Sequence, residues 1–256
     1  MSAPVFLVER GSLDQVEAGA QVVLTGAEAR HAVHARRIAV GEVVDLADGA
    51  GQRARGVVRQ VDPSPKAPTL TLQVDARSFE AEPASRFVLV QALAKGDRDL
   101  AAIEAATELG VDAIVPWQAE RSVVVWRAER AAKSRNRWAA TVLAASKQAR
   151  RSRVPVVTEL HDTDALTARV EASALALVLH EEAEQPLAGV ALPAEGDVLL
   201  VVGPEGGIGP GELARLIAAG AVAVRLGSTV LRSSTAGPAA LAVLNARGRW
   251  TRSDGA

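Results

Sequence analysis

The second part of the chain alternates apolar segments with helical ones, and this alternation constrains the fold more than any other feature. The apolar segments are residues 86–93, 111–117, 154–157, 174–180, 197–202 and 221–226, and each carries apolar side chains at odd and even positions alike. A strand with this pattern is buried on both faces, as in a parallel sheet that helices cover on each side. We therefore predict a parallel α/β domain over residues 76–256.

The helical segments of this domain carry signals for where they begin and end. Asp97 is predicted to cap a helix that runs to Leu109, and Gly110 to stop it. Pro210 stands at the first position of another predicted helix, and Gly220 stands just past its end. Further helices are predicted at residues 127–149, at residues 163–171 and at the C-terminal end.

Residues 1–75 have a different pattern, with short strand-like segments and one brief helical stretch at residues 26–37. The strand-like segments are residues 4–8, 21–25, 42–47, 54–61 and 69–74. Asp48-Gly49 is a tight turn signal, and the proline-rich residues 62–68 interrupt the last hairpin. This pattern predicts a small β-barrel, with a linker at residues 79–85.

Length and composition exclude several classes of protein. The 256 residues, of which 48% are hydrophobic, are enough for two domains with a sizeable core. The absence of cysteine excludes disulfides, zinc ribbons, iron–sulfur clusters and thiol nucleophiles. No apolar run reaches the roughly 18 residues that span a bilayer, and the first residues lack a signal-peptide pattern. We expect a cytoplasmic protein with no metal and no membrane partner.

The net charge of −1 provides no overall field that would attract nucleic acid, so RNA binding would need local basic patches. Three clusters are present. They comprise Lys133, Arg135, Arg137, Lys147, Arg150, Arg151 and Arg153; Arg30, His31, His34, Arg36 and Arg37; and Arg53, Arg55 and Arg59. Each cluster alone is equally consistent with a solvated surface and with a patch that binds a polyanion. Together they favour a polyanionic partner.

A glycine-rich loop follows one of the buried strands, in the sequence VLLVVGPEGG at residues 198–207. Ligands of α/β proteins bind beside such loops, at the carboxyl ends of the strands. The glycine spacing that begins at Gly203 matches neither the dinucleotide-binding motif nor the P-loop motif, which argues against a site for nucleotide phosphates. A plain turn that needs glycine for its backbone angles is the simpler interpretation of this loop taken alone.

A second strand, glycine loop and helix start follow at residues 224–241, in the sequence VRLGSTVLRSSTAGPAAL. Two neighbouring glycine loops with Arg232 beside them would form a shared cleft, which favours a ligand site. Here the chain resembles the ribosomal RNA small subunit methyltransferase E family, within the SPOUT superfamily of knotted methyltransferases. The matching segments are residues 95–124, 144–155, 179–183, 199–207 and 226–236, and residues 31–49 resemble the PUA-like domain of the family.

The resemblance implies an architecture and a reaction. It implies a PUA-like RNA-binding β-barrel at residues 1–75 and a SPOUT domain at residues 76–256, whose C-terminal segment forms a deep trefoil knot. The cofactor would be S-adenosylmethionine, and the product N3-methyluridine in small-subunit (16S) ribosomal RNA. The substrate would be this RNA in an assembled or nearly assembled subunit, and the working unit a homodimer.

The resemblance also implies site residues. The expected cofactor-binding residues are Leu179, His180, Gly203, Pro204, Glu205, Gly206, Gly207, Leu226, Gly227, Leu231, Arg232 and Ser233. The expected RNA-binding residues are Arg30, Arg36, Arg37, Lys95, Arg121, Lys147, Arg150, Arg151 and Arg153.

Arg232 and Glu205 are the expected catalytic residues. Uracil N3 must lose its proton before it attacks, and an always-charged arginine would stabilise the resulting anion. Glu205 would either take that proton or hold the loop amides, and we favour the second role. His180 is a weaker candidate base, because a lone histidine at a strand end more often has a structural role. Most of the four tryptophans are expected to serve packing.

The chain departs from the family pattern at three positions. Ala105 stands where the family has lysine, and Lys147 and Ser234 stand where it has glutamate. The first departure would weaken one RNA contact. The other two argue against a mechanism that uses carboxylates at those positions.

Three other functions are weighed against this one. A SPOUT methyltransferase that acts on a tRNA or on large-subunit ribosomal RNA is the nearest alternative, and the N-terminal PUA-like pattern disfavours it. A non-catalytic RNA-binding relative with a decayed site is disfavoured by the intact glycine loops. A nucleotide-binding metabolic enzyme is disfavoured because no phosphate motif fits.

Overall fold

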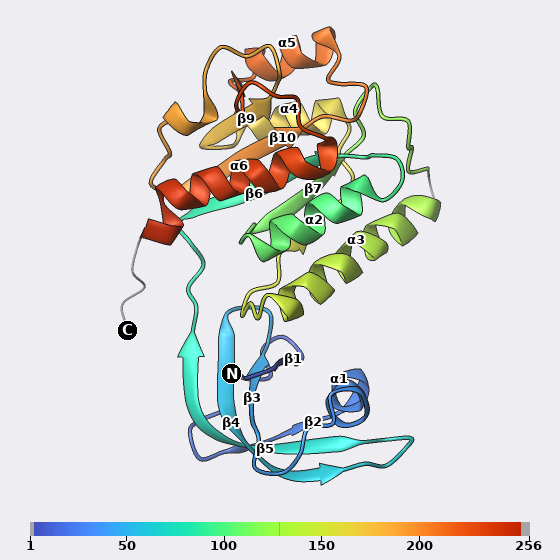
Figure 1. The fold of residues 1–256 in the computed structure, drawn as a ribbon, viewed down its shortest axis with the longest axis vertical. Helices are drawn as coiled ribbons and strands as arrows, with labels where there is room; N and C mark the ends of the chain where they lie inside the picture. Colours follow the sequence, from blue (N-terminus) through green and yellow to red (C-terminus); the bar gives the residue numbers. More distant parts are fainter. Residues whose placement is uncertain (1–2, 128, 252–256) are drawn as a thin grey trace. The chain divides into compact units, whose positions relative to one another are not determined.

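The computed structural model describes residues 3–127 and 129–251, which divide into two compact units (Figure 1). The first unit consists of the described residues up to Glu82 together with Ser146–Val154, and the second contains the others. Among the helices in these residues, none combines the length and the apolar character that crossing a membrane requires.

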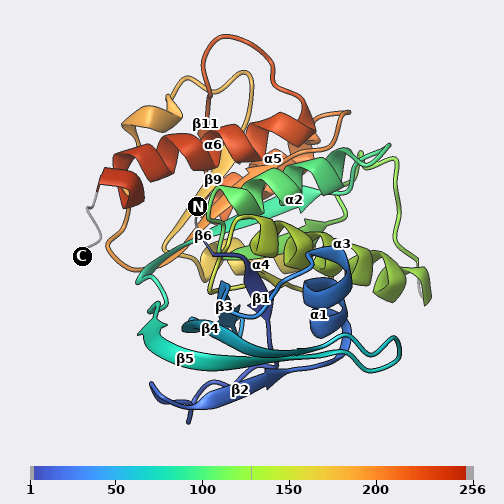
Figure 2. The ribbon, with the colours of Figure 1, turned by 60° about the horizontal axis from the view of Figure 1, so that its bottom comes forward.

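The first unit is a five-stranded mixed sheet that forms a PUA-like half-barrel. Its strands are β1 (Val5–Leu7), β2 (Gln21–Leu24), β3 (Val43–Ala47), β4 (Gln52–Asp62) and β5 (Thr69–Phe79), in the order β1-β3-β4-β5-β2. Only the β1–β3 pairing is parallel among these described strands. The helical stretch divides into α1 (Gly26–Arg30) and a π-helix, η1 (His31–Ala35). Ala29 of α1 belongs to the same core cluster as Leu46 and Leu72. Helix α1 lies against β5 (Figure 2).

Strand β5 continues beyond residue 75, where the predicted barrel domain ends. Leu70, Leu72 and Val74 are buried, but the residues after them are largely exposed. The apolar alternation therefore ends in the sequence while backbone pairing with β4 continues to Phe79. The compact unit ends after Glu82, within the predicted linker.

Ser146–Val154 belongs to the first unit, although neighbouring residues on both sides belong to the second. The N–H of Gly51 donates to the carbonyl of Ser152 at 3.1 Å, and the N–H of Val154 donates to that of Gly49 at 3.0 Å. Lys147 pairs with Glu28. A part of the predicted basic patch is thus built into the N-terminal sheet.

The second unit confirms the predicted parallel α/β fold. Its six-stranded, all-parallel sheet has the order β11-β9-β10-β6-β7-β8. The strands are β6 (Ser85–Ala92), β7 (Ala113–Trp117), β8 (Val156–Val157), β9 (Leu175–Leu179), β10 (Gly196–Val202) and β11 (Val222–Val224). The helices are α2 (Arg98–Glu108), α3 (Glu129–Gln148), α4 (Thr163–Glu171), α5 (Pro210–Ala218), α6 (Ser233–Arg247) and the short 3-10 helices η2 (Leu187–Gly189) and η3 (Arg249–Thr251).

Both faces of this sheet are covered, as the apolar strands predict. Val88 and Val90 of β6 pack in one cluster with Leu166 of α4 and Leu216 of α5. The other face of β6 is covered by α2 and α6 (Figure 1). Gly237 lets α6 approach closely, since a Cβ at this position would lie 2.8 Å from Cδ1 of Leu89.

The tryptophans serve packing at three of their four positions. Trp117, Trp126 and Trp138 are buried, and the last two form an edge-to-face pair with ring centroids 5.2 Å apart. Trp250 is exposed.

The helix ends follow the sequence signals with one exception. Gly110 and Gly220 have φ angles of +88° and +103°, which suit glycine at a helix end. Pro210 opens α5 as predicted. Asp97 stands at the start of α2, but the predicted side-chain cap is wrong. Its backbone is left-handed, with φ 58°, and its carboxylate instead pairs with Arg137 at 3.1 Å.

Candidate functional site

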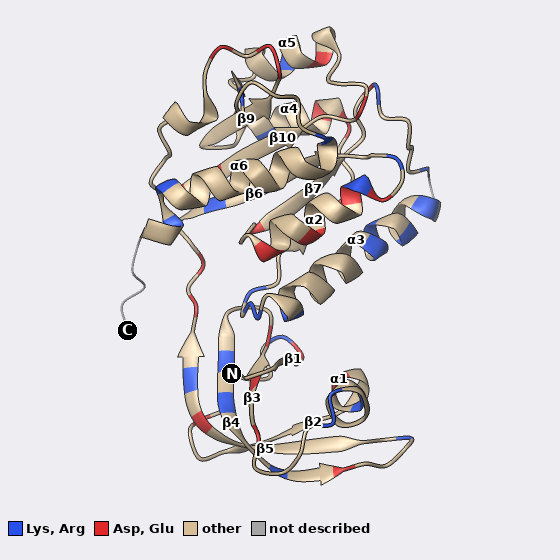
Figure 3. Ribbon diagram, viewed as in Figure 1, with Lys and Arg blue, Asp and Glu red and all other residues tan. Residues whose placement is uncertain are grey.

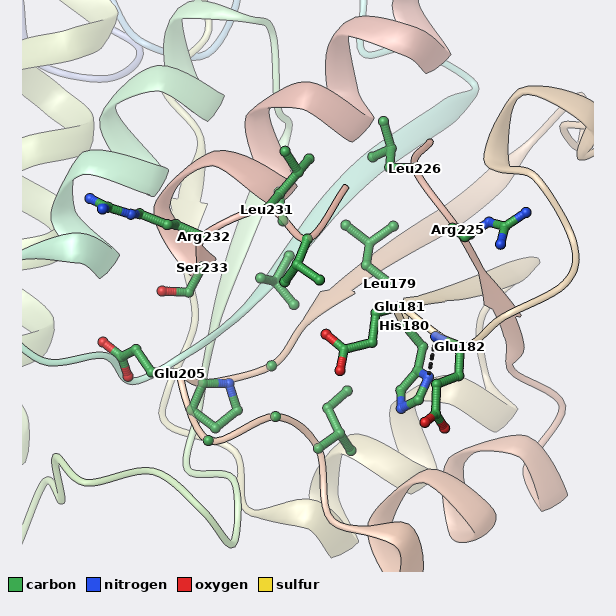
Figure 4. A pocket seen from close by; sticks show the side chains of 18 of the residues that line it. Leu179, His180, Glu181, Glu182, Glu205, Arg225, Leu226, Leu231, Arg232 and Ser233 are labelled. Carbon is green, nitrogen blue, oxygen red and sulfur yellow. Dashed lines mark hydrogen bonds between the residues drawn. The ribbon is translucent and has the colours of Figure 1, made fainter. Parts of the chain in front are cut away.

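A cavity of about 740 Å³ lies in the second unit, where the loops after β9, β10 and β11 meet (Figure 4). All twelve residues predicted to bind the cofactor line it. They are Leu179, His180, Gly203, Pro204, Glu205, Gly206, Gly207, Leu226, Gly227, Leu231, Arg232 and Ser233. The parallel topology explains why they meet, because it brings the carboxyl ends of these strands to one edge of the sheet.

The loop after β10 needs glycine for two different reasons. A Cβ on Gly203 would lie 2.7 Å from Cγ1 of Ile208, so the backbone packs too closely for a side chain. Gly207 has a φ angle of +71°, and its N–H donates to the carbonyl of Pro204 at 2.9 Å. The glycines therefore shape a tight turn, and this turn also forms a wall of the cavity.

Glu205 is engaged by the start of α2. Its Oε1 accepts hydrogen bonds from the N–H of Lys95 at 3.0 Å and from Nη1 of Arg98 at 2.8 Å. Desolvation acts to raise the pKa of Glu205, but hydrogen bonds from the N–H groups of Glu205 and Lys95 and the pairing with Arg98 together lower it. The carboxylate is therefore ionised at neutral pH and already accepts hydrogen bonds, which suits a loop anchor better than a proton acceptor.

Two arginines hold this loop, and both line the cavity. Arg98 binds Glu205, and Nη1 of Arg121 donates to the carbonyl of Gly206 at 3.1 Å. Arg121 is a predicted RNA contact that the structure places on the loop. The role of Arg98 was not predicted, since nothing in the local pattern of the sequence links it to a loop more than 100 residues away.

Arg232 and Ser233 stand where α6 begins. The carbonyl of Arg232 accepts from the N–H groups of Thr235 at 2.8 Å and Ala236 at 3.0 Å. The guanidinium of Arg232 is exposed, and no other described residue binds it. Ser233 is only 8% exposed, and its hydroxyl has no hydrogen-bond partner among the described residues. The cavity is therefore lined by an arginine beside the positive end of a helix (Figure 4).

The loop after β9 contributes a histidine and two glutamates. Nδ1 of His180 accepts from the N–H of Glu182 at 3.3 Å, so this ring is engaged in its own turn. This contact favours the structural role for His180. The carboxylate of Glu181 extends from the end of β9 among the lining residues, whereas that of Glu182 points away from them (Figure 4).

The residues predicted to bind RNA are spread over both units, and several bind other parts of the protein. Figure 3 shows basic residues on β4 and on α3, and acidic residues on β5 and α2. The exposed ones are Arg30, Arg36, Arg37, Lys95, Arg121 and Arg150. Lys147 pairs with Glu28, and Arg153 donates from Nε to the carbonyl of Glu80 at 2.8 Å. Arg151 is half-buried.

The three departures from the family pattern lie outside the cavity. Ala105 is in the middle of α2, Ser234 is on α6, and Lys147 belongs to the first unit. None of them lines the cavity. Within residues 3–127 and 129–251, no group of three or more histidine, aspartate or glutamate side chains is arranged to hold a metal ion.

Comparison with known proteins identifies both parts of the chain. Residues 81–245 match the model of an RNA methyltransferase domain, and residues 24–65 match that of an RNA methyltransferase PUA domain. The ribosomal RNA small subunit methyltransferase E of Mycobacterium tuberculosis is 45% identical over 242 residues, which cover 93% of this chain and 91% of that protein. The enzyme of the same name from Bacillus subtilis is 29% identical over 247 residues, which cover 94% of this chain and 95% of that protein.

Solved structures agree with these matches. The ribosomal RNA small subunit methyltransferase E of Neisseria gonorrhoeae, bound to S-adenosyl methionine, superimposes with a TM-score of 0.81 and 26% identity over 96% of this chain and 98% of that one. A putative methyltransferase from Legionella pneumophila, also in complex with this cofactor, gives a TM-score of 0.82 with 25% identity over 96% of this chain and 98% of that one. With its PUA-like half-barrel and parallel α/β unit, the chain belongs to the ribosomal RNA small subunit methyltransferase E family.

Proposed function

We propose that this protein transfers a methyl group from S-adenosylmethionine to N3 of a uridine in small-subunit (16S) ribosomal RNA. The observation that carries the proposal is the cavity formed by the two glycine loops, with Arg232 among its lining residues and no partner for its guanidinium in the described part of the chain. The names of the relatives support small-subunit RNA as the substrate, in preference to tRNA or large-subunit RNA.

The residues present fit the cofactor. The cavity of about 740 Å³ has the size of a small-molecule site. Leu179, Leu226 and Leu231 offer apolar walls for a flat ring, and the glycine loops let backbone groups approach its edges. When bound, S-adenosylmethionine would supply an electrophilic methyl group on a sulfonium. The two similar solved structures described above contain this cofactor.

Positioning supplies most of the catalysis in this proposal, because a methyl transfer needs the acceptor nitrogen held in line with the methyl group. Glu205, fixed by Arg98 and the N–H of Lys95, holds the glycine loop in the shape that the ligand requires. Arg232 stabilises the oxygen that becomes negative when uracil N3 loses its proton. Water then takes this proton, since the carboxylate of Glu205 is occupied.

The partners of the reaction stay predictions. They are a second copy of the chain in a homodimer, and small-subunit RNA in an assembled or nearly assembled subunit. Arg30, Arg36, Arg37 and Arg150 are exposed and suited to phosphate contacts, while Lys147 and Arg153 stabilise the first unit.

The direct test is methylation of RNA from a bacterial strain that lacks its own member of this family. Purified protein and S-adenosylmethionine would be incubated with naked 16S RNA, with small subunits, with large subunits and with tRNA. Mass mapping of nuclease digests should find one N3-methyluridine, in the small-subunit RNA. A methyl group on another atom or in another RNA would refute the proposal.

A further inference from the structure

Glu181 is a cavity-lining carboxylate that has no partner among the residues that the structure describes. It follows β9 after His180, its side chain is exposed, and no described residue donates a hydrogen bond to it or pairs with it. Figure 4 shows this carboxylate extending among the lining residues, whereas the neighbouring Glu182 directs its carboxylate away. Glu205, the third glutamate of the cavity, is bound to Arg98.

The charges around the cavity are otherwise unfavourable for a cation. Once the Arg98–Glu205 pair is set aside, Arg121, Arg225 and Arg232 remain as cationic lining residues. Glu181 and Glu182 oppose them, and of these two only Glu181 is directed into the cavity. The charge of these lining residues is therefore positive on balance, and Glu181 is the carboxylate among them that could attract a cation within the cavity.

The proposed reaction begins with a cation and ends with a neutral compound. S-adenosylmethionine carries a sulfonium, an ammonium and a carboxylate, and so has a net single positive charge. Loss of the methyl group leaves the uncharged thioether of S-adenosylhomocysteine. The two ligands share every other group, so only an interaction with the sulfonium charge can separate them electrostatically.

Resting on the proposed function, we propose that Glu181 is a cofactor-selectivity residue. Its carboxylate attracts the sulfonium and so favours the charged cofactor over the neutral product in a cavity whose arginines favour the reverse. When the methyl group leaves, the attraction ends, which assists release of the product. Glu181 takes no part in the chemistry of transfer.

The size of the effect follows from the exposure of the side chain. A charge pair near the surface is weak, and a half-enclosed cavity strengthens it moderately. We expect removal of the charge of Glu181 to weaken binding of S-adenosylmethionine about five- to tenfold and binding of S-adenosylhomocysteine less than about twofold.

Calorimetry with both ligands tests this inference on the purified full-length protein. Glu181→Gln removes the charge and keeps the shape, Glu181→Asp keeps the charge, and Glu182→Gln removes an equivalent charge that points away. The ratio of the two dissociation constants should shift only in Glu181→Gln, with Glu181→Asp close to the original protein. Raising the salt concentration should reduce the difference in this ratio between the original protein and Glu181→Gln, because screening weakens the attraction that only the original protein has.

Each outcome decides between the inference and its alternatives. If Glu181→Gln weakens both ligands equally, the carboxylate binds a group that they share, and the inference is wrong. If neither affinity changes, Glu181 is a solvated side chain, and the inference is also wrong, although the proposed function stands. If the original protein binds neither ligand, the proposed cofactor fails, and this inference fails with it.

Discussion

Oε1 of Glu205 accepts a hydrogen bond from Nη1 of Arg98 at 2.8 Å, and this contact joins the glycine loop after β10 to the first residue of α2. The N–H of Lys95 donates to the same oxygen at 3.0 Å. Contacts within the protein therefore hold the loop in its shape. The carboxylate that the family resemblance places beside the cofactor is an anchor for that shape.

Glu205→Gln distinguishes an anchor from a general base. We expect weaker cofactor binding, because the amide loses the ionic part of the contact with Arg98, while the single-turnover rate at saturating cofactor falls less than about tenfold. Loss of a general base would cost about 10²–10⁴-fold in that rate. Rapid-quench measurement of methyl transfer separates the two cases.

The same contact predicts a pH dependence of stability. The pKa of Glu205 is lowered in the folded protein, so its pairing stabilises the fold above the ordinary pKa of glutamate and is lost as the pH falls through the lowered value. The difference in melting temperature between the original protein and Glu205→Gln should therefore be present at pH 7 and shrink below about pH 4. A difference that grows on acidification would contradict the assignment.

Asp99 predicts the opposite dependence. Burial raises the pKa of this carboxyl, while hydrogen bonds from the N–H groups of Leu100 and Ala94 lower it less. A raised pKa means that the buried charge costs stability at neutral pH, and that the cost disappears as the pH falls. Asp99→Asn keeps an acceptor for Leu100, and we expect it to raise the melting temperature at pH 7 by a few degrees, with no gain in acid.

Glycine substitutions test the shape of the cavity wall. Gly203→Ala would place a Cβ 2.7 Å from Cγ1 of Ile208, so the loop must shift and cofactor affinity should fall at least tenfold. Gly206→Val would press on Cβ of Arg121, which a Cβ would approach to 3.3 Å, and should abolish binding. Gly211→Ala is the control, since a Cβ there meets nothing within 4 Å. Equal cofactor affinities in all three variants would show that this loop is not part of the cofactor site.

Arginine substitutions separate RNA contacts from structural ones. Arg36 is exposed, and no described residue binds its side chain. Arg36→Ala should therefore reduce the slope of the logarithm of RNA affinity against the logarithm of salt concentration by about 0.7–0.9. The melting temperature should stay the same. Arg153 binds the carbonyl of Glu80 and lies 5.7 Å from the ring centroid of Phe79. Arg153→Ala should therefore lower the melting temperature. An unchanged salt slope in Arg36→Ala would mean that this arginine is a solvated surface residue without a phosphate contact.

Features that depend on local patterns were predictable from the sequence. The apolar strands predicted a parallel sheet, and Pro210 and Gly220 predicted the ends of α5. The cofactor residues came from the resemblance to a family, and the structure brings all of them to one cavity. The trefoil knot stays a prediction.

Features that depend on contacts between distant residues were not predictable. The left-handed backbone of Asp97 directs its carboxylate to Arg137, which no capping rule anticipates. Ser146–Val154 joins the first unit through pairing with residues about 100 positions earlier. The direction of Glu181 likewise depends on the turn after β9. The chain has His180, Glu181 and Glu182 in succession, and the sequence does not show which of these side chains points into the cavity.

The pH dependence of methyl transfer by Arg232→Ala tests the central claim most directly. Arg225→Ala is the matched control, because Arg225 also lines the cavity and is exposed, and no other described residue binds its side chain. Arg225 lies apart from Arg232 in Figure 4. If Arg232 stabilises the uracil anion, the single-turnover rate of Arg232→Ala is strongly reduced at pH 7 and recovers as rising pH ionises the uracil, while Arg225→Ala follows the original protein. A rate of Arg232→Ala that stays flat from neutral to strongly alkaline pH would contradict the account.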